Sequence, residues 1–474
     1  MVKRLGIVLA FLLMVAMAVP ALAADVKIKG DFNNRFMVYT NHNDWLSSEK
    51  AVLHDGTVDE TWGEAKYRMW FDATTNDGKV KGVWAFEIGG LEYGKPGSLG
   101  KSVGGSYSGD AINVETRWLY TDFQLPWACN KARVRMGLQP FTVNSYLWQE
   151  TVMGVTTDIA AGPVEIIAGW LRPYRDPVKD DKSDVEDLDA FYARVNFKPT
   201  DGVKAGVFGL YMTGDGDKAN GGTITSQYYE VKNFKNNYDM DLWFLGTDGK
   251  ANFGMVFVNW DLIYETGSID NASFSESYNG WAYNEARAND DFDVSAWLAH
   301  VDVGAKLGSL KLTGTILYTS GDDDGNDSDL DGFMAVDIDR TDSVTLMEGG
   351  FTDDDYYTEK DYMLDKGLWL FKGAADYKVS KKLTVGGALM YMMTAEDIEY
   401  SYVDGNGVTQ NESDDSLGIE VNAYLKYKLY DNLEFAVNAG YLFADDAMDF
   451  WEVDKDGNSD EDIFISTARV RYKF

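Results

Sequence analysis

Apolar and polar residues alternate along many segments of the chain. The clearest examples are ADVKIKGDFNNRFMVY (24–39), KARVRMGLQ (131–139), LGIEVNAYLKYKL (417–429) and STARVRYKF (466–474). An α-helix would mix the two kinds of side chain around its surface, whereas a β-strand places successive side chains on opposite faces. These segments therefore predict strands of about ten residues with one apolar face and one wet face.

The spacers between these segments are alternately short and long. The short ones, each suited to a tight hairpin turn, are TNDGK, PWACN, AGP, PTDG, TDGK, GS, VSKK and DN. The long ones run approximately over 41–60, 93–112, 140–150, 172–185, 213–237, 265–291, 321–365, 396–415 and 446–461. This alternation places every short turn at one end of the strands and every long loop at the other. It predicts an all-β fold, a transmembrane antiparallel up-and-down β-barrel with short periplasmic turns and long extracellular loops.

We expect about eighteen strands, or about sixteen if segments 151–160 and 203–212 are not strands. Proline cannot donate to a strand ladder, so its positions test the assignment. The seven prolines after the first 23 residues fall in the assigned turns, in loops or at their edges, and are Pro96, Pro126, Pro140, Pro163, Pro173, Pro177 and Pro199. The alternative fold is a soluble β-sandwich or propeller, which would bury the apolar faces against a second sheet.

The opening MVKRLGIVLAFLLMVAMAVPALAAD has the features of a signal peptide. Lys3 and Arg4 precede an apolar run of about fifteen residues, and Ala21-Leu22-Ala23 forms a small-residue cleavage site. We expect residues 1–23 to be removed and residues 24–474 to form the barrel. A membrane anchor is the alternative, but the run is shorter than the roughly twenty residues that span a bilayer.

Composition argues against several other classes. Charged residues make up 25% and aromatic residues 14%, with 47 Gly and 8 Pro, which excludes a disordered polymer and a helical membrane protein. The single Cys129 forms no internal disulfide, and His42, His54 and His300 show no metal-binding spacing. We therefore expect no enzyme and no cofactor, although an outer-membrane hydrolase and an adhesin remain as alternatives.

The last strand ends on outward-facing Val470, Tyr472 and Phe474. Together with the leader, the first strand and the rhythm of the spacers, this ending resembles that of bacterial outer-membrane porins, most of all the homotrimeric porins of sulfate-reducing bacteria. The resemblance implies the outer membrane of a Gram-negative bacterium, with both termini periplasmic and Phe474 read by the barrel assembly machinery. It also implies a homotrimer in contact with membrane lipid and lipopolysaccharide. No nucleic acid partner is expected.

A barrel of sixteen to eighteen strands leaves an aqueous channel, whereas one of eight is filled by its own side chains. We therefore expect passive diffusion of ions and small hydrophilic solutes. The alternative is a channel specific for a sugar, an organic acid or phosphate.

Inward-facing charges are the candidates for selectivity. The arginines expected on neighbouring inner rows are Arg35, Arg68, Arg117, Arg133 and Arg135. In porins that this chain resembles, a third external loop folds inward; here that loop is PFTVNSYLWQE, with the charge of Glu150 and the bulk of Phe141, Tyr146 and Trp148. Arg469 and Arg471 are expected near the periplasmic exit. The alternative is that these arginines are solvated or paired across strands.

Acidic residues dominate one external loop. The net charge is −34, and residues 321–365 hold sixteen Asp or Glu against Arg340 and Lys360. Such a mouth enriches cations, which opposes the arginine rows. Within this loop Asp327, Asp329 and Asp331 have the alternating spacing of calcium ligands, but Ile338 stands where an EF-hand needs its bidentate Glu. The alternatives are a weak calcium site and a solvated acidic loop.

Overall fold

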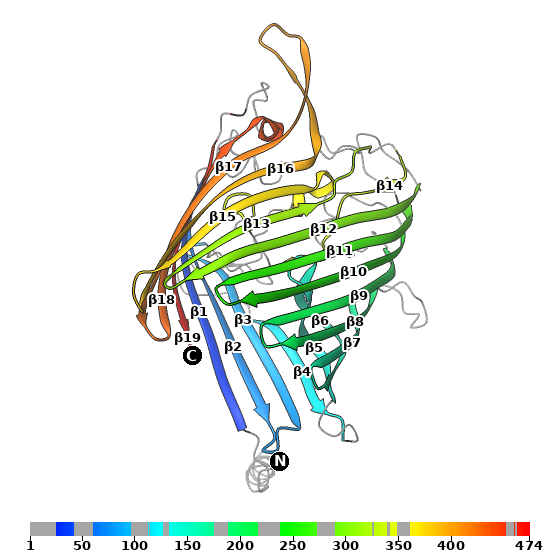
Figure 1. Ribbon diagram of the computed structural model, residues 1–474, viewed down its shortest axis with the longest axis vertical. Helices are drawn as coiled ribbons and strands as arrows, with labels where there is room; N and C mark the ends of the chain where they lie inside the picture. Colours follow the sequence, from blue (N-terminus) through cyan, green and yellow to red (C-terminus); the bar gives the residue numbers. More distant parts are fainter. Residues whose placement is uncertain are drawn as a thin grey trace, which may run out of the picture.

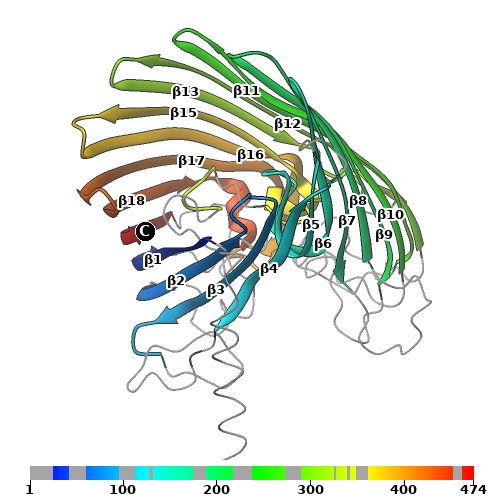
Figure 2. The same ribbon diagram turned by 90° about the horizontal axis from the view of Figure 1, so that it is seen from below.

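The chain forms one sheet that closes into a barrel (Figures 1 and 2). The computed structural model describes residues 25–41, 60–95, 112, 114–126, 132–174, 188–216, 238–272, 290–324, 327–338, 342–347, 361–451, 459 and 462–474. The strands are β1 (Asp25–Thr40), β2 (Glu60–Thr74), β3 (Val80–Glu92), β4 (Glu115–Gln124), β5 (Ala132–Asn144), β6 (Trp148–Ala161), β7 (Val164–Tyr174), β8 (Leu188–Thr200), β9 (Val203–Gly216), β10 (Tyr238–Phe253), β11 (Val256–Ala272), β12 (Asp290–Leu307), β13 (Leu310–Thr319), β14 (Asp329–Leu330), β15 (Leu368–Lys378), β16 (Leu383–Val403), β17 (Thr409–Tyr430), β18 (Leu433–Ala444) and β19 (Ile463–Lys473). Two short 3-10 helices are also present, η2 (Asp361–Lys366) and η3 (Asp446–Trp451).

The wall is antiparallel throughout and has no open edge. Sequential strands pair with one another, and β19 pairs with β1 from Asp31↔Lys473 to Thr40↔Phe464. The two-residue β14 is an exception, because it pairs in parallel with β12 while β13 pairs directly with β15. Of the 19 strands in the described sheet, all but β14 therefore form the wall, which has 18 strands. The expected fold and the higher of the two expected strand counts are confirmed.

The two ends of the barrel differ in their connections. At one end, here called the short-turn end, tight turns join the strands, and Gly162 and Gly308 adopt φ of 67° and 64°, which glycine tolerates without strain. The long connections all lie at the other end, here called the loop end. β1 begins and β19 ends at the short-turn end (Figure 1). Among the described residues, no helix is long and apolar enough to cross a membrane.

Some spacers were assigned wrongly from the sequence. TDGK (247–250) lies inside β10, and the turn is at Gly254–Met255. The polar residues of that segment belong to an inward row, where Asp248 accepts a hydrogen bond from Arg194. Much of the long spacer 396–415 is strand, because β16 and β17 continue as a hairpin beyond the wall (Figure 1).

Three prolines lie within strands. Pro199 is next to the end of β8, where the register with β9 shifts between Phe197 and Thr200. Pro140 lies within β5, at a point where the pairing of β5 with β4 has already ended at Leu138. Pro173 lies within β7, where the register with β8 shifts between Leu171 and Tyr174. In all three places the ladder is interrupted on at least one side, so a residue without an N–H is accommodated.

The apolar stripes face outward, as expected. In β1, Val26, Ile28 and Phe36 are each more than half exposed, whereas Asn33 and Arg35 on the alternate row are 4% and 1% exposed. Leu417 departs from the pattern and is buried, because the β16–β17 register shifts beside it and Gly418 adopts φ of 114°. Apart from such bulges, the assignment of one row to the outside and one to the inside is correct.

Aromatic side chains form a row around the outside near the loop end. Pairs of neighbouring rings lie 4.4–4.5 Å apart between centroids and are Tyr211–Trp243, Tyr264–Trp297 and Tyr318–Trp369. Phe253, ten residues after Trp243, lies outward at the short-turn end of the same strand. That separation is about 33 Å along a strand and about 25 Å along the axis of a barrel with a tilt near 40°, the height of a membrane-spanning apolar band.

The inward rows change character along the strands. In β10 the inward row has Met240, Leu242 and Phe244 toward the loop end, followed by Asp248 and Lys250 toward the short-turn end. The expectation that charged rows surround water along the whole interior is therefore wrong for the loop half, where inward residues of many strands join one buried apolar cluster. Both faces of the strands are apolar there because segments of the chain fold into the barrel and cover the inner face.

Candidate functional site

The hairpin between β5 and β6 projects its tip into the barrel. The amide of Asn144 donates to Asp261 Oδ1 at 2.7 Å and to Asp248 Oδ2 at 3.2 Å, both on inward rows of other strands. Asn144 also accepts a hydrogen bond from the backbone N–H of Tyr146 at 2.8 Å, which holds the tip in an Asx turn. The tip, here defined as Asn144–Trp148, is thus attached to the wall by one amide side chain.

The aromatic residues expected to narrow the interior lie on or beside this tip. Phe141, Tyr146 and Trp148 are all buried, and the rings of Phe141 and Trp148 are 5.1 Å apart between centroids. Glu150 faces inward opposite Phe141 and accepts a hydrogen bond from the N–H of Thr151 at 2.6 Å. The expected loop 140–150 is shorter than predicted, since only residues 145–147 lie outside the two strands.

His300 forms the surface against which Tyr146 packs. The two rings are 4.7 Å apart between centroids. His300 Nδ1 lies 2.7 Å from Asp261 Oδ2, and Nε2 lies 3.2 Å from Asp302 Oδ1. Because Asp261 also binds Asn144, one carboxylate joins the tip and the histidine. Sequence reasoning identified no role for His300, although its place on an inward row follows from the alternation of β12.

A second segment folds into the barrel from the connection between β13 and β15. The backbone N–H groups of Val336 and Asp337 donate to the Leu147 carbonyl at 2.9 and 3.0 Å, and Gln149 N–H donates to the Asp337 carbonyl at 2.8 Å. Residues 330–338 and 342–347 of this connection, here called the inner segment, therefore lie against the tip. Tyr362 of η2 completes the contact by donating to the Tyr146 carbonyl at 2.7 Å.

Two carboxylates of the wall hold the inner segment. Glu265 accepts a hydrogen bond from the N–H of Met334 at 2.9 Å. Glu420 accepts four from the inner segment, from Ser343 Oγ at 2.5 Å, Thr345 Oγ at 2.6 Å, Val344 N at 2.9 Å and Thr345 N at 3.2 Å. Both glutamates are fully buried. The many acidic residues of the loop suggested only a solvated surface, so this inward anchoring was not foreseen.

Replacing Glu420 with alanine should release the inner segment. Each buried donor that loses its acceptor costs about 1–3 kcal/mol, so four donors give an expected loss of at least about 4 kcal/mol in docking of residues 343–345. Limited proteolysis of the purified protein should show new cleavage within 342–347. Glu434→Ala is the control, because Glu434 is partly exposed and contacts Arg469 at 3.3 Å. Equal protease resistance in the two variants would contradict this anchoring.

The predicted arginines are paired with acids. Glu87 lies 2.5 Å from Arg68, 2.8 Å from Arg117 and 3.2 Å from Lys66. Arg133 and Arg135 lie 2.5 and 3.5 Å from Asp122, and Arg35 pairs with Glu64. The geometry matches the alternative in which arginines pair across strands. The interior of the short-turn half therefore carries charges of both signs.

Exposure separates these arginines into two groups. The side chains of Arg133, Arg135 and Arg117 are 36%, 29% and 24% exposed, so a solute in the barrel can reach them. Arg35 is 1% exposed and cannot contact a solute directly. Arg469 is also buried and lies opposite Arg35, whereas Arg471 binds Asp31 through two hydrogen bonds of 2.7 and 2.6 Å.

Arg194 is a further inward arginine that sequence reasoning missed. It donates to Asp248 at 2.8 Å and to the Val143 carbonyl at 3.1 Å, and so connects β8 and β10 with the base of the tip. The alternation of β8 places Arg194 on the same inner row as Tyr192 and Asn196. The signal was therefore present in the sequence.

Asp327, Asp329 and Asp331 lie in the connection after β13. Asp327 accepts a hydrogen bond from the N–H of Asp329 at 2.9 Å. Burial, followed by the nearby carboxylates of Asp329, Asp323 and Asp327, raises the pKa of Asp331. In the described part of the chain, no group of three or more His, Cys, Asp or Glu side chains is arranged to hold a metal ion.

The terminal Phe474 packs on the outside of β1. Its backbone exchanges hydrogen bonds of 3.0 and 3.1 Å with Gly30, and its ring lies 5.6 Å from Phe32 and 5.2 Å from Tyr472 between centroids. A Cβ at Gly30 would lie 2.3 Å from the Phe474 ring. The glycine thus leaves the space that the aromatic ring covers.

Gly30→Val should therefore displace the Phe474 ring. Overpacking of this kind costs about 1–3 kcal/mol, so we expect a smaller fraction of folded, heat-modifiable protein on gels. Gly82→Val is the matched control, because a Cβ at Gly82 meets nothing within 4 Å. An equal folded fraction for the two variants would show that the ring does not need this space.

Comparisons with known proteins bear on the fold. No protein-family model matches the chain, and no curated protein matches it. Among solved structures, Acinetobacter baumannii OccAB1 aligns with a TM-score of 0.54 and 12% identity over 96% of this chain and 98% of that one. Pseudomonas aeruginosa OccK8 (OprE) aligns with a TM-score of 0.51 and 11% identity, covering 95% and 98%. A BenF-like porin from Pseudomonas fluorescens Pf-5 aligns with a TM-score of 0.50 and 12% identity, also covering 95% and 98%. At this identity the likeness shows the fold alone, which in this chain is an antiparallel barrel with 18 wall strands.

Proposed function

We propose that the protein is an outer-membrane channel for passive diffusion of ions and small hydrophilic solutes. The observation that carries the proposal is the division of the wall, whose apolar side chains face outward while charged side chains face inward over the short-turn half. Partly exposed charges such as Arg133 and Arg135 need water inside the barrel to solvate them. The exposed apolar band on the outside is stable in the hydrocarbon of a membrane.

A substrate-specific channel is the second candidate, and the interior of the loop half favours it. The tip and the inner segment contact each other. Asp261 of the wall binds the tip, and Glu265 and Glu420 of the wall bind the inner segment. Material packed inside a barrel narrows the path that a solute follows, and a narrow path lined by a few polar groups selects its solute. The solute classes proposed from the sequence are sugars, organic acids and phosphate.

Single-channel recording in planar bilayers tests both candidates. A passive channel gives ohmic current that rises linearly with salt, and a salt gradient gives a reversal potential that measures its preference for cations or anions. A specific channel shows current block that saturates with its solute. Adding a sugar, an organic acid and phosphate in turn identifies the class, and block by none of them favours general diffusion. A complete lack of conductance would contradict both candidates.

We further propose that the short turns and both ends of the barrel are periplasmic, that residues 1–23 are a cleaved signal peptide and that residues 24–474 form the barrel domain. The rhythm of short turns and long connections supports this orientation. Residues 1–24 lie outside the described residues. Protease added to intact cells should cleave near 404–407, at the tip of the β16–β17 hairpin, and leave the short turns uncut.

The assembly and partners are likewise proposals. The packing of Phe474 on Gly30 supports an ending that the barrel assembly machinery reads. The resemblance to the homotrimeric porins of sulfate-reducing bacteria supports a trimer, with lipid and lipopolysaccharide at its outer surface. Native gel electrophoresis of protein extracted in mild detergent should give a species of three chains that dissociates on heating.

A further inference from the structure

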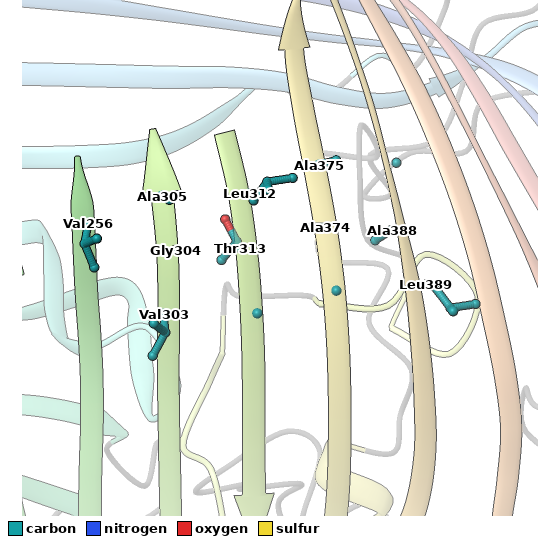
Figure 3. Close-up of a pocket in the computed structure, with 13 residues that line it drawn as sticks. Val256, Val303, Gly304, Ala305, Leu312, Thr313, Ala374, Ala375, Ala388 and Leu389 are labelled. Atoms are coloured by element: carbon teal, nitrogen blue, oxygen red, sulfur yellow. The ribbon is translucent and has the colours of Figure 1, made fainter. Parts of the chain in front are cut away.

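A groove runs over the outer face of the wall between β11 and β16 (Figure 3). Its volume is about 710 Å³, and its lining is mainly apolar. Val303, Leu312 and Leu389 form its sides and are each more than 40% exposed. A cavity of this size falls in the range that holds a drug-sized ligand.

Strand register explains why the wall is hollow here. Gly314 pairs with Gly373, and Ala375 pairs with Gly387, so the outward row of three neighbouring strands has almost no side chain. A Cβ at Gly373 would meet nothing within 4 Å, and one at Gly314 would meet only the Val303 carbonyl at 3.8 Å. Backbone packing therefore does not require glycine at positions 314 and 373, and the space in front of these two is open, whereas a Cβ at Gly387 would lie 2.7 Å from the Asn422 carbonyl.

The groove lies toward the short-turn end, where the surface is basic. The turn below it, residues 378–382, contains three lysines and no acid. Lys306 and Lys311 are not counted, because they lie over the buried ring of Phe257 on the inner side of the wall. Lys378, Lys381 and Lys382 are exposed, and Tyr377 beside them is 49% exposed on the outer face. The local charge is thus positive, although the chain as a whole has a net charge of −34.

We propose that the groove seats an acyl chain of an anionic phospholipid, whose phosphate lies against Lys381 and Lys382. The inference rests on the proposed membrane location and concerns the leaflet at the short-turn end. The outward glycines provide the space for the chain, and Tyr377 marks the level of the headgroups, where aromatic side chains gather. Phosphate and ammonium groups attract one another strongly at such an interface.

Charge distinguishes a lipid from a second copy of the protein as the occupant. A bulky side chain from a neighbouring barrel would fill the groove but would bring no anion to the lysines. An anionic phospholipid can place its apolar chain in the groove and its phosphate beside the lysines at the same time.

Native mass spectrometry of the purified, delipidated protein in detergent tests the proposal, with phosphatidylglycerol as the probe. The double variant Gly314→Phe/Gly373→Phe fills the groove, and Gly82→Phe adds an outward ring on β3, where a Cβ also meets nothing within 4 Å. We expect the groove variant to retain about tenfold less phosphatidylglycerol than wild type or Gly82→Phe, the change that about 1.4 kcal/mol of binding free energy produces.

The headgroup contact needs its own variant. Lys381→Gln/Lys382→Gln should lose the preference for phosphatidylglycerol over phosphatidylethanolamine while the groove still accepts an acyl chain. Equal retention by the groove variant and Gly82→Phe would overturn the proposal. So would a groove variant that keeps its lipid but dissociates from oligomer to single chains, since a second copy would then occupy the groove. Lipid retention is measured without current, so failure here is distinguishable from failure of the channel proposal.

Discussion

Replacing Asn144 with alanine should convert steady single-channel current into current that switches between two levels. The Asn144 amide donates to both Asp261 and Asp248, on β11 and β10. A hydrogen bond to a charged group contributes about 1.5–3 kcal/mol, so losing both shifts the balance between docked and undocked tip by about 3 kcal/mol. That shift is roughly a hundredfold in the population ratio. An undocked tip leaves a wider path, so the added level should have the higher conductance.

Asn252→Ala is the matched control for this experiment. Asn252 is an exposed asparagine of β10 next to the turn at Gly254, and its amide makes one hydrogen bond of 3.4 Å to the Gly202 carbonyl. Tyr146→Ala should also raise conductance, but without switching, because it removes the ring that packs on His300 and leaves the Asn144 contacts intact. If Asn144→Ala gave the same steady current as Asn252→Ala, the tip would not be held by its amide.

The strands and their apolar outer face could be predicted from the alternation of apolar and polar residues alone. Strands such as β1 and β19 separate apolar from polar side chains because one face meets hydrocarbon and the other does not, and a period of two records this directly. The prediction of turns from polar spacers was wrong where the residues are polar because they line the inside of the barrel. TDGK (247–250) resembles a turn in composition, but Asp248 is polar because it binds Arg194 and Asn144 inside the barrel.

For the interior, the sequence predicted which side chains of a regularly alternating strand face inward, but not which residues of other strands they contact. Arg133 and Arg135 were placed inward correctly, since their strand alternates cleanly, but their pairing with Asp122 depends on cross-strand register. Register is set by turns and bulges and is not visible in one strand. The same limit applies to Glu420, whose four donors in the inner segment lie about 75 residues earlier.

The candidate site differs most from prediction where distant segments meet. His300 on β12 and Tyr146 on the tip are 154 positions apart in the chain, and nothing in either local sequence indicates that their rings are in contact. Sequence reasoning placed the bulk of Tyr146 in the interior but assigned it no contact partner. What it could not supply was the second, inner segment, because a stretch rich in acids was expected to remain in solvent.

Replacing Glu64 with alanine should strongly destabilise the barrel. Glu64 and Arg35 form an ion pair across β2 and β1, and their side chains are 0% and 1% exposed. Removing one member of a buried pair leaves the other charge in a medium of low dielectric constant without its carboxylate, which costs about 3–5 kcal/mol. The cost is increased by Arg469, a second cation directly opposite Arg35 in the register of β1 and β19.

Urea-induced unfolding from lipid vesicles, followed by tryptophan fluorescence, measures this loss. Asp25→Ala is the control, because Asp25 pairs with Lys27 at 3.8 Å while both side chains are about two-thirds exposed, and such pairs contribute little. The double variant Glu64→Leu/Arg35→Met should recover most of the stability, since it removes both charges and refills the space with apolar side chains. A Glu64→Ala midpoint equal to that of Asp25→Ala would mean that water reaches Arg35 from inside the barrel. The arginine would then line the solute path after all, and its replacement should alter the reversal potential as well as the stability.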